Sequence, residues 1–429
     1  MRKTILLLIV LMNIIIAQKN FDLDKCIEIA NKNNPDMKLA DMEVKSAQYR
    51  IKGSYSGILP NISTGADWNH MNQGEREYYV GGVKQVQPET SSESYNLGIN
   101  YHQNLYDGGA WWNQIKRAKN NYQNAIVNRK QTNKQIKAYV SQQYYKILKA
   151  KKLLDVYKSA LKTSQKQLDK SKEMYELGQV ARKDFLKARV KKGNDTLNII
   201  QQKRTIKSLK NELARIMGYQ ENDFTIIETD YLSPADYQLN TSLKKAMEHN
   251  PGLQSLQYQK KIAQLNYNIA RSNLTPTLST NLSYSRGGSK VSRVYSDFDK
   301  FWNTSIGLNL SIPIFQGFST RTNIEKTHIE YEKYEARINN KELEIRKNIK
   351  DLIQKLETYN EMLEVNKINL ESAEEDLRAA QEMYKLESAT MLEVLDAQSN
   401  LTRARGNLIS TKYEAKVAEV NLRYYMGTK

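Results

Sequence analysis

The side chains that most often carry out chemistry are few and widely spaced in this chain. It has 429 residues, with one Cys, Cys26, and four His, at positions 70, 102, 249 and 328. Histidines that far apart lack the spacing of a metal site, and a single Cys forms no disulfide within the chain. No Gly-rich loop ends in Lys followed by Ser or Thr, and no nucleophile is paired with a nearby His. We therefore expect no enzyme activity, no metal site and no cofactor.

The chemistry that remains is that of charge. Glu393 and Asp396 are three residues apart, so on a helix they share one face. Carboxylates held close together repel and raise each other's pKa unless cations or basic groups stand between them. This pair is therefore either a functional acidic cluster or an acidic helix face in contact with solvent.

The chain that positions these residues repeats itself once. Several motifs recur at a fixed distance, namely Asn34-Pro35 as Asn250-Pro251 after 216 positions, and Tyr175 as Tyr384 and Met217-Gly218 as Met426-Gly427 after 209 positions. The distance changes once, by seven residues, between Pro60 and Leu105. So long a period excludes a short solenoid repeat and indicates a duplicated half-molecule. The copies are residues 18–217 and 251–429, and residues 218–250 link them as a small belt with a short helix.

Each copy has two segments in which apolar and polar side chains alternate, at residues 61–71 and 95–105 and at 277–285 and 304–314. Alternation is typical of a strand with two different faces, and about ten residues is enough to cross a bilayer. Any one such strand alone would favour an ordinary half-buried hairpin in a soluble sheet, but four in register behind a signal peptide favour a membrane. Polar, Gly-rich loops at 72–94 and 286–303 join them. The four Trp lie in or beside the strands, as interface aromatics do rather than scattered core residues: Trp68, Trp111, Trp112 and Trp302.

Long helices follow the strands. Apolar residues at seven-residue spacing predict coiled-coil helices over residues 108–177 and 317–386. Shorter helices are expected at 182–217 and 391–426, and others before the strands at 35–59 and 251–274. The fold class is therefore mixed and mainly helical, with long antiparallel coiled coils and four strands per chain.

The N-terminus has the pattern of a secretory signal peptide over residues 1–17. Arg2 and Lys3 precede an apolar run from Ile5 to Ile16, which is shorter than the ~20 residues of a membrane-spanning helix. No other stretch approaches that length, so we expect no transmembrane helix in the mature protein. Four strands cannot close a barrel, since about eight are needed, and oligomerisation is therefore required.

At this point the chain resembles the TolC family of outer-membrane efflux and secretion channels over nearly its whole mature length. The family's strand-to-helix junction stands here as Pro313-Ile314-Phe315-Gln316-Gly317. Its tip pattern stands as Tyr175, Gly178, Asp184 and Leu186, and in the second copy as Tyr384, Glu393, Leu395 and Asp396. The resemblance implies a homotrimer, in which three chains form one twelve-stranded transmembrane β-barrel continued by a helical tunnel (α-barrel) in the periplasm.

The resemblance also implies a function. The chain would be the outer-membrane channel, or exit duct, of a tripartite efflux or type I secretion system. It would be a passive conduit opened at its periplasmic tip by a periplasmic adaptor (membrane fusion) protein and an inner-membrane pump of the RND, ABC or MFS type. It would contact outer-membrane lipid and no nucleic acid. The alternative is a secreted structural coiled-coil surface protein that binds anionic polymers, which would have no need of the four alternating strands.

Site roles follow from the same resemblance. It assigns the periplasmic gate to Tyr384, Glu393 and Asp396, with Asp184 as a partner. Because Ala389 replaces the family's gate Arg, the cations that could pair with the gate are Arg182, Lys183 and Lys187. The adaptor would contact the tip at Tyr175, Gly178, Leu186 and Leu395.

Charge distinguishes the two copies. Residues 108–217 hold 27 Lys and Arg against 7 Asp and Glu, whereas residues 317–426 hold 17 against 20. We hypothesise that this asymmetry guides assembly and gives an acidic adaptor a basic surface. The alternative is a solvated basic surface without a partner.

Overall fold

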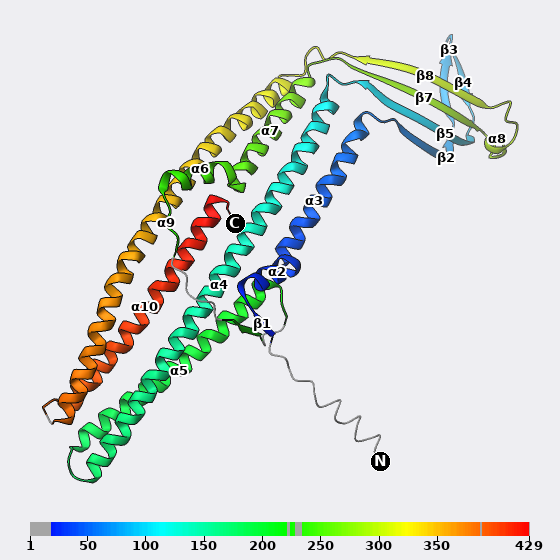
Figure 1. Cartoon of the computed structure of the whole chain (residues 1–429). Helices are drawn as coiled ribbons and strands as arrows, with labels where there is room; N and C mark the ends of the chain where they lie inside the picture. The colour runs from blue at the N-terminus through cyan, green and yellow to red at the C-terminus, as the bar shows by residue number, and fades with distance from the viewer. Residues whose placement is uncertain (1–18, 221–223, 228–233, 387, 429) are drawn as a thin grey trace, which may run out of the picture. The chain divides into compact units, whose positions relative to one another are not determined.

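The computed structural model describes residues 19–220, 224–227, 234–386 and 388–428 (Figure 1). The expected signal peptide, residues 1–17, lies outside the described residues. The chain forms two compact units. We call Met1–Met42, Val127–Gln254 and Asn339–Lys429 the helical unit, and Glu43–Ile126 with Ser255–Ile338 the sheet unit. Each unit combines matching segments of both copies, so the structural division does not follow the duplication.

Seventeen helices and strands occur in the described part of the chain, together with a 3-10 turn at Ser54–Gly57. In order they are β1 (Lys19–Phe21), α2 (Leu23–Asn33), α3 (Pro35–Gly53), β2 (Asn61–Gln73), β3 (Arg76–Val80), β4 (Val83–Gln87), β5 (Thr90–Tyr106), α4 (Ala110–Glu176), α5 (Arg182–Met217), β6 (Phe224–Ile226), α6 (Leu239–His249), α7 (Pro251–Ser272), β7 (Thr277–Gly288), α8 (Ser292–Tyr295), β8 (Trp302–Ser311), α9 (Ser319–Lys385) and α10 (Met391–Met426). α4 and α9 each have 67 residues, and α5 and α10 each have 36. These two pairs of helices therefore match residue for residue between the copies, whereas α3 has 19 residues and α7 has 22.

The sheet unit holds an antiparallel sheet in the order β2-β5-β7-β8. Its register places like residues side by side across all four strands. One cross-strand row is Ile62, Tyr101, Leu282 and Ile306, and the next is Ser63, Asn100, Ser283 and Ser305. Because successive side chains point to opposite faces, one face is mainly apolar and the other is polar. The main exception on the apolar face is Arg286, in the row with Leu97 and Trp302.

The apolar face is open in the single chain. Ile306 and Leu308 of β8 are 78% and 72% exposed, and the outer edges of β2 and β8 have no strand partner within the described residues. A sheet that exposes an apolar face and two edges is prone to pair with other chains. Within the described residues, nothing in the single chain covers Ile306, Leu308 or these edges.

Three sequence-based expectations for this unit need correction. The loop at 72–94 contains the hairpin β3-β4, whose turn at Gly81-Gly82 has φ of 60° and 88° at both positions, as a two-residue hairpin turn requires. The loop at 286–303 contains the short helix α8. The strand expected at 304–314 begins at Trp302 and ends at Ser311, because Pro313 has no N–H to donate to a neighbouring strand.

The other strands run further into the loops than predicted, since β2 reaches Gln73, β5 begins at Thr90 and β7 reaches Gly288. The helix expected at 35–59 ends earlier, at Gly53, where a 3-10 turn takes over. Glycine favours such an end because its helix propensity is low.

The core of the helical unit lies where β1, α2 and β6 pack against α4 and α5. Cys26 and Tyr144 are fully buried there, and the Tyr144 hydroxyl donates to the Ile227 carbonyl at 2.7 Å. Three heptad positions of α9, Ile349, Leu356 and Leu363, are buried too, whereas Leu370, Leu377 and Tyr384 are half-buried. Among the described residues, no helix is both long and apolar enough to cross a bilayer.

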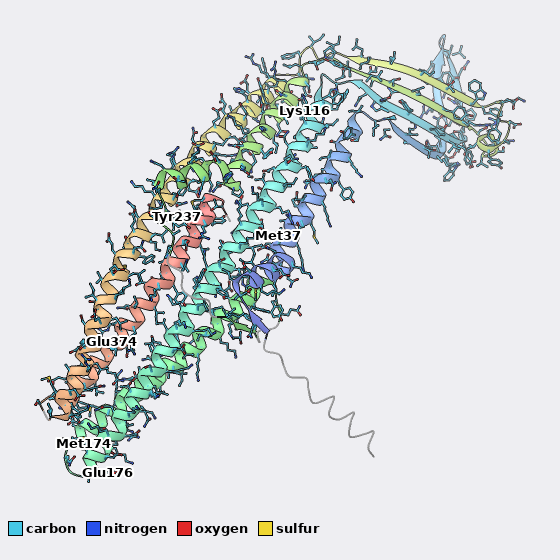
Figure 2. All side chains as sticks on the ribbon, viewed as in Figure 1. Met37, Lys116, Met174, Glu176, Tyr237 and Glu374 are labelled. Atoms are coloured by element: carbon cyan, nitrogen blue, oxygen red, sulfur yellow. The ribbon has the colours of Figure 1, made fainter. Side chains whose placement is uncertain are left out.

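A further contact fixes the segment between the copies to α10. Tyr237, labelled in Figure 2, donates its hydroxyl hydrogen to Glu419 at 3.0 Å and accepts from the Arg423 guanidinium at 3.0 Å. Glu419 is only 3% exposed and also pairs with Lys416 at 2.8 Å. These cations hold the pKa of Glu419 below its usual value against the opposing effect of burial, which is the largest single contribution.

The repeated Asn-Pro motifs join short helices end to end. The Asn34 amide donates to the Ile216 carbonyl in the last turn of α5 at 2.7 Å, while its oxygen accepts from the backbone of Asp36 and Met37 at the start of α3. In the second copy Asn250 donates to the Tyr425 carbonyl of α10 and accepts from Leu253 of α7. Each Asn thus satisfies the free backbone groups of two helix ends at once.

Glycine completes each of these junctions. Gly218 has φ of 62°, and a Cβ there would lie 2.6 Å from the Asn33 carbonyl oxygen. Gly427 has φ of 68° and packs in the same way on the His249 carbonyl. Both the left-handed backbone and the close approach exclude other residues, which accounts for the repeated Met-Gly pair.

Replacing Asn34 with Ala should destabilise the protein by about 1–3 kcal/mol, because it leaves a buried carbonyl and two N–H groups unpaired. Asn34→Asp keeps the acceptor and should cost less. Thermal unfolding of the detergent-solubilised protein, followed by circular dichroism, measures both. Asn273→Ala, at an exposed position, is the control, and equal effects at both positions would contradict this role.

Candidate functional site

The tip is the part of the helical unit where α4 turns into α5 and α9 turns into α10. Met174 and Glu176 at the end of α4 are labelled in Figure 2. Gly178 ends α4 with φ of 78°, and the Gln179 N–H donates back to the Met174 carbonyl at 2.8 Å. This is the glycine-dependent helix end that satisfies the last carbonyls of a helix.

At the second turn the Ser388 N–H donates to the Met383 carbonyl in the same way, but the start of α10 has a side-chain cap that α5 lacks. Thr390 caps α10 by accepting from the Glu393 N–H at 3.4 Å, and the Glu393 carboxylate accepts from the Thr390 N–H at 3.1 Å. The two residues form a reciprocal capping box. Glu393 therefore has a structural role at the start of α10, in addition to the gate role that the sequence suggests.

Tyr384 lies in a pocket of about 530 Å³ between the two turns, which Asp184, Lys187 and Ala389 also line. The Lys170 ammonium lies 5.4 Å from the centre of its ring, within range of a cation–π interaction. Burial raises the pKa of the Tyr384 hydroxyl, and the charge of Asp184 raises it further. The hydroxyl is buried, and no group among the described residues accepts a hydrogen bond from it.

Asp396 lies in a second groove, of about 730 Å³, between α5 and α10. Basic and apolar side chains line it together: Arg182, Lys183, Leu186, Lys187, Val190 and Leu395. Within the described part of the chain, Asp184, Glu393 and Asp396 form no ion pair within 4 Å. The groove thus combines one carboxylate with several cations that are near it without being bonded to it.

The remaining predicted tip residues are divided between these features. Tyr175 stacks on Phe185 with ring centres 6.0 Å apart. Leu186 is 42% exposed, whereas Leu395 is buried at 6%. The tip therefore brings Asp184 close to Tyr384 and brings Asp396 close to the three cations. The Glu393 carboxylate instead accepts a hydrogen bond from the Thr390 N–H at the start of its own helix.

Two of the Trp residues lie in the strands, and the other two lie at the start of the helix that follows β5. Trp68 on β2 and Trp302 at the start of β8 are 63% and 52% exposed. Trp111 and Trp112 stand in the first turn of α4, where Trp111 packs against Gly57. Strands of this length span about 30 Å between the two sets.

This geometry can be compared with known proteins. The chain matches the sequence model of the family described as "Outer membrane efflux protein" over residues 26–219 and 242–428. The chain belongs to this family. The resemblance to the TolC family is thereby confirmed, together with the mainly helical fold and the outer-membrane location.

Individual relatives agree with this assignment. The outer membrane protein TolC of Salmonella enteritidis is 21% identical over 93% of this chain and 80% of its own length. The proteases secretion protein PrtF of Dickeya chrysanthemi is 21% identical over 94% of this chain and 87% of its own. A crystal structure of CusC has the same fold, with a TM-score of 0.82 at 18% identity, covering 95% of this chain and 92% of that one.

Sequence reasoning missed three contributors to the tip, namely Lys170, Phe185 and Thr390. Thr390 could have been found, because Thr followed three residues later by Glu is the sequence signature of a capping box. Lys170 and Phe185 have no such signal, since their contacts with Tyr384 and Tyr175 join separate helices.

The capping box gives a test of what Glu393 does. Glu393→Gln keeps an acceptor for the Thr390 N–H, whereas Glu393→Ala removes it and should destabilise the first turn of α10 by about 0.5–2 kcal/mol. Hydrogen exchange at the amides of residues 391–394 measures this. Faster exchange in the Ala variant alone is expected, and equal exchange in both variants would contradict the capping role.

Proposed function

We propose that three copies of this chain form the exit duct of an efflux or secretion system, in which the four-stranded sheets close one barrel in the outer membrane. The observation that carries the proposal is the sheet itself, with one apolar face, one polar face and two open edges. Three sheets supply twelve strands, which is above the roughly eight needed to enclose an interior. The number three follows from the resemblance to the TolC family.

In this arrangement the apolar rows face lipid. The polar face, rich in Ser, Asn and Gly, lines the interior, where small polar side chains leave room for water and cargo. The exposed Trp68 and Trp302 on the strands, and Trp112 at the start of α4, suit the two membrane interfaces. The sheet then needs no cover from other parts of its own chain.

The membrane placement predicts opposite outcomes on the two faces. Leu308→Arg puts a charge on the apolar face of β8 and should cost about 2–4 kcal/mol near the bilayer centre. Asn309→Arg changes the neighbouring residue on the polar face and should be tolerated. The measurement is the amount of heat-modifiable oligomer in the outer-membrane fraction. Equal tolerance of both variants would favour the alternative of a secreted coiled-coil surface protein.

The proposed gate lies at the tip, in the periplasm. Threefold symmetry would bring three copies of Asp396 and of Tyr384 towards one axis, with Asp184 beside Tyr384. The cations in the groove, Lys183 and Lys187 with Arg182, would moderate the repulsion between the carboxylates. An adaptor that binds the apolar part of the groove at Leu186 would separate α5 from α10 and open the tip, and an inner-membrane pump would supply the energy.

Removing the charges at the tip tests this gate. In planar bilayers, Asp396→Asn should reduce block by divalent cations, because the acidic ring that attracts them is lost. Glu393→Gln, which keeps the capping box, separates charge from structure and should act in the same direction. Unchanged block and conductance in the double variant would overturn the gate assignment.

The same proposal includes the chemical class of the cargo. Relatives are named for efflux and for protease secretion, so either small molecules or polypeptides fit a duct of this kind. Identifying the pump that copurifies with the chain, and measuring which compounds accumulate when its gene is deleted, distinguishes the two.

A further inference from the structure

The connection between β7 and β8 is built around one buried cation. Arg286, near the end of β7, is only 3% exposed although it lies on the mainly apolar face of the sheet. We call residues 287–301, which follow it, the Arg286 loop. The Arg286 Nη2 donates to four backbone carbonyls of this loop, those of Arg293, Ser296, Asp297 and Lys300, at 3.4, 2.5, 2.8 and 3.3 Å.

The charge of Arg286 is not neutralised by these contacts. Its acceptors are carbonyl oxygens, and its Nε and Nη1 are buried without an acceptor among the described residues. The guanidinium carbon lies 4.4 Å from the centre of the Phe298 ring, within range of a cation–π interaction. Arg286 therefore holds the loop by hydrogen bonds and an aromatic contact, and adds its positive charge to the loop.

The backbone of the Arg286 loop is strained at two points. Asp297 has φ of 52° and Phe301 has φ of 60°, a left-handed conformation that is unfavourable for a bulky side chain and persists only where the surroundings enforce it. The Gly287 N–H donates to the Phe301 carbonyl at 3.3 Å, and the Trp302 indole N–H donates to the Asp299 carbonyl at 3.2 Å. These bonds fix the loop in one conformation, so the surface that it presents is preformed.

The Arg286 loop folds over the end of the apolar face. Gly288 points to the same face as Arg286, and a Cβ there would lie 2.5 Å from Cδ of Arg293, so the Arg293 side chain crosses β7 at this position. The helix α8 packs against β7 and β5 and lies at the end of these strands (Figure 1). The loop covers only this end of the face, and Ile306 and Leu308 stay exposed.

The outward surface of the Arg286 loop combines apolar side chains with cations. Val291, Tyr295 and Phe298 are 52%, 64% and 71% exposed. Lys290 and Lys300, next to them in the chain, are exposed as well. Exposed aromatic and aliphatic side chains beside Lys are typical of a segment that lies in a membrane interface.

The two long loops of the sheet unit differ in charge. Residues 286–303 hold four basic and two acidic residues, whereas residues 72–94 hold two basic and four acidic ones. The acidic loop forms the hairpin β3-β4, which is a separate two-stranded sheet. The basic loop is thus the one that folds over the apolar face, where a membrane with anionic headgroups would attract it.

We propose that the Arg286 loop lies in the headgroup layer of the outer leaflet and binds the phosphate groups of an anionic lipid through Lys290 and Lys300. Val291, Tyr295 and Phe298 enter the boundary between headgroups and acyl chains. The inference rests on the membrane placement of the proposed function, because the loop continues the lipid-facing rows of the sheet into the headgroup layer. A lipid is the occupant that this continuity favours over a soluble partner, which would have to enter the bilayer to reach the same face.

Lipid binding by the full-length oligomer in neutral detergent tests the two lysines. The probe is diphosphoryl lipid A, and native mass spectrometry measures how much of it is bound. Lys290→Gln with Lys300→Gln should lower the affinity by up to about thirtyfold, which is about fivefold for each Lys. Arg76→Gln with Lys84→Gln removes two exposed charges from the hairpin β3-β4 and should leave the affinity unchanged.

Two outcomes of this measurement would overturn the proposal. One is an equal affinity for lipid A in the two double variants, which would mean that the position of the charges does not matter. The other is displacement of lipid A by inorganic phosphate at the same concentration, which would indicate a site for free phosphate without a contribution from the apolar side chains.

The depth of the loop is tested by fluorescence quenching. Tyr295→Cys, labelled with a small thiol-reactive fluorophore in the reconstituted oligomer, should be quenched by lipids brominated near the headgroup. Tyr79→Cys in the hairpin β3-β4, where Tyr79 is 69% exposed, is the matched control and should not be quenched. Cys26 should stay unlabelled, because it is buried and its pKa is raised to about 12. Equal quenching at both positions, or none at position 295, would contradict the placement of the loop.

The two levels of proposal fail in different ways. A chain that forms no oligomer in the outer-membrane fraction would overturn the proposed function and this inference together. A heat-modifiable oligomer that inserts normally, but whose affinity for lipid A does not depend on Lys290 and Lys300, would overturn the inference alone.

Discussion

The rest of the structure depends on one constraint, which is that an apolar sheet face with two open edges must be covered. Within the described residues the cover is missing, because β2 and β8 end the sheet and Ile62 and Ile306, at the two ends of one cross-strand row, stay exposed. Burying that surface stabilises by about 25 cal/mol per Å². A single chain in water therefore lacks this large favourable free energy of burial. Lipid and further copies of the chain can supply it, and this explains why a duplicated, helix-rich protein keeps four strands.

The helices follow a second constraint, that of equal length. α4 and α9, and α5 and α10, match residue for residue, while the loops between the strands differ by the seven residues that shift the repeat. Helices that pack in register cannot gain or lose residues without moving every heptad contact, whereas loops tolerate insertions. Geometry has thus been kept in both copies, and charge has been free to change.

The tip shows where pattern and structure differ. The heptads, the Gly178 turn and the tip motifs could be recognised from sequence because each depends on neighbours in the chain. Glu393 looked like a gate residue alone, but its carboxylate bonds to its own Thr390 N–H. In the sheet unit, the hairpin β3-β4 lies within the predicted loop 72–94, although Gly81-Gly82 between Val80 and Val83 is typical of a hairpin turn. The contacts of Tyr384 with Lys170 and Asp184 join three separate helices, so no local pattern predicts them.

The sequence by itself determined the duplication, the fold class, the four alternating strands and the paired helix lengths, because each follows from a regular spacing of residues along the chain. Only the tertiary structure decided that Asn34 and Asn250 lock helix ends together and that Asp396 shares a groove with the cations of α5. These properties depend on residues tens to hundreds of positions apart. Periodicity fixes which face of a helix is apolar, but only packing fixes what that face meets.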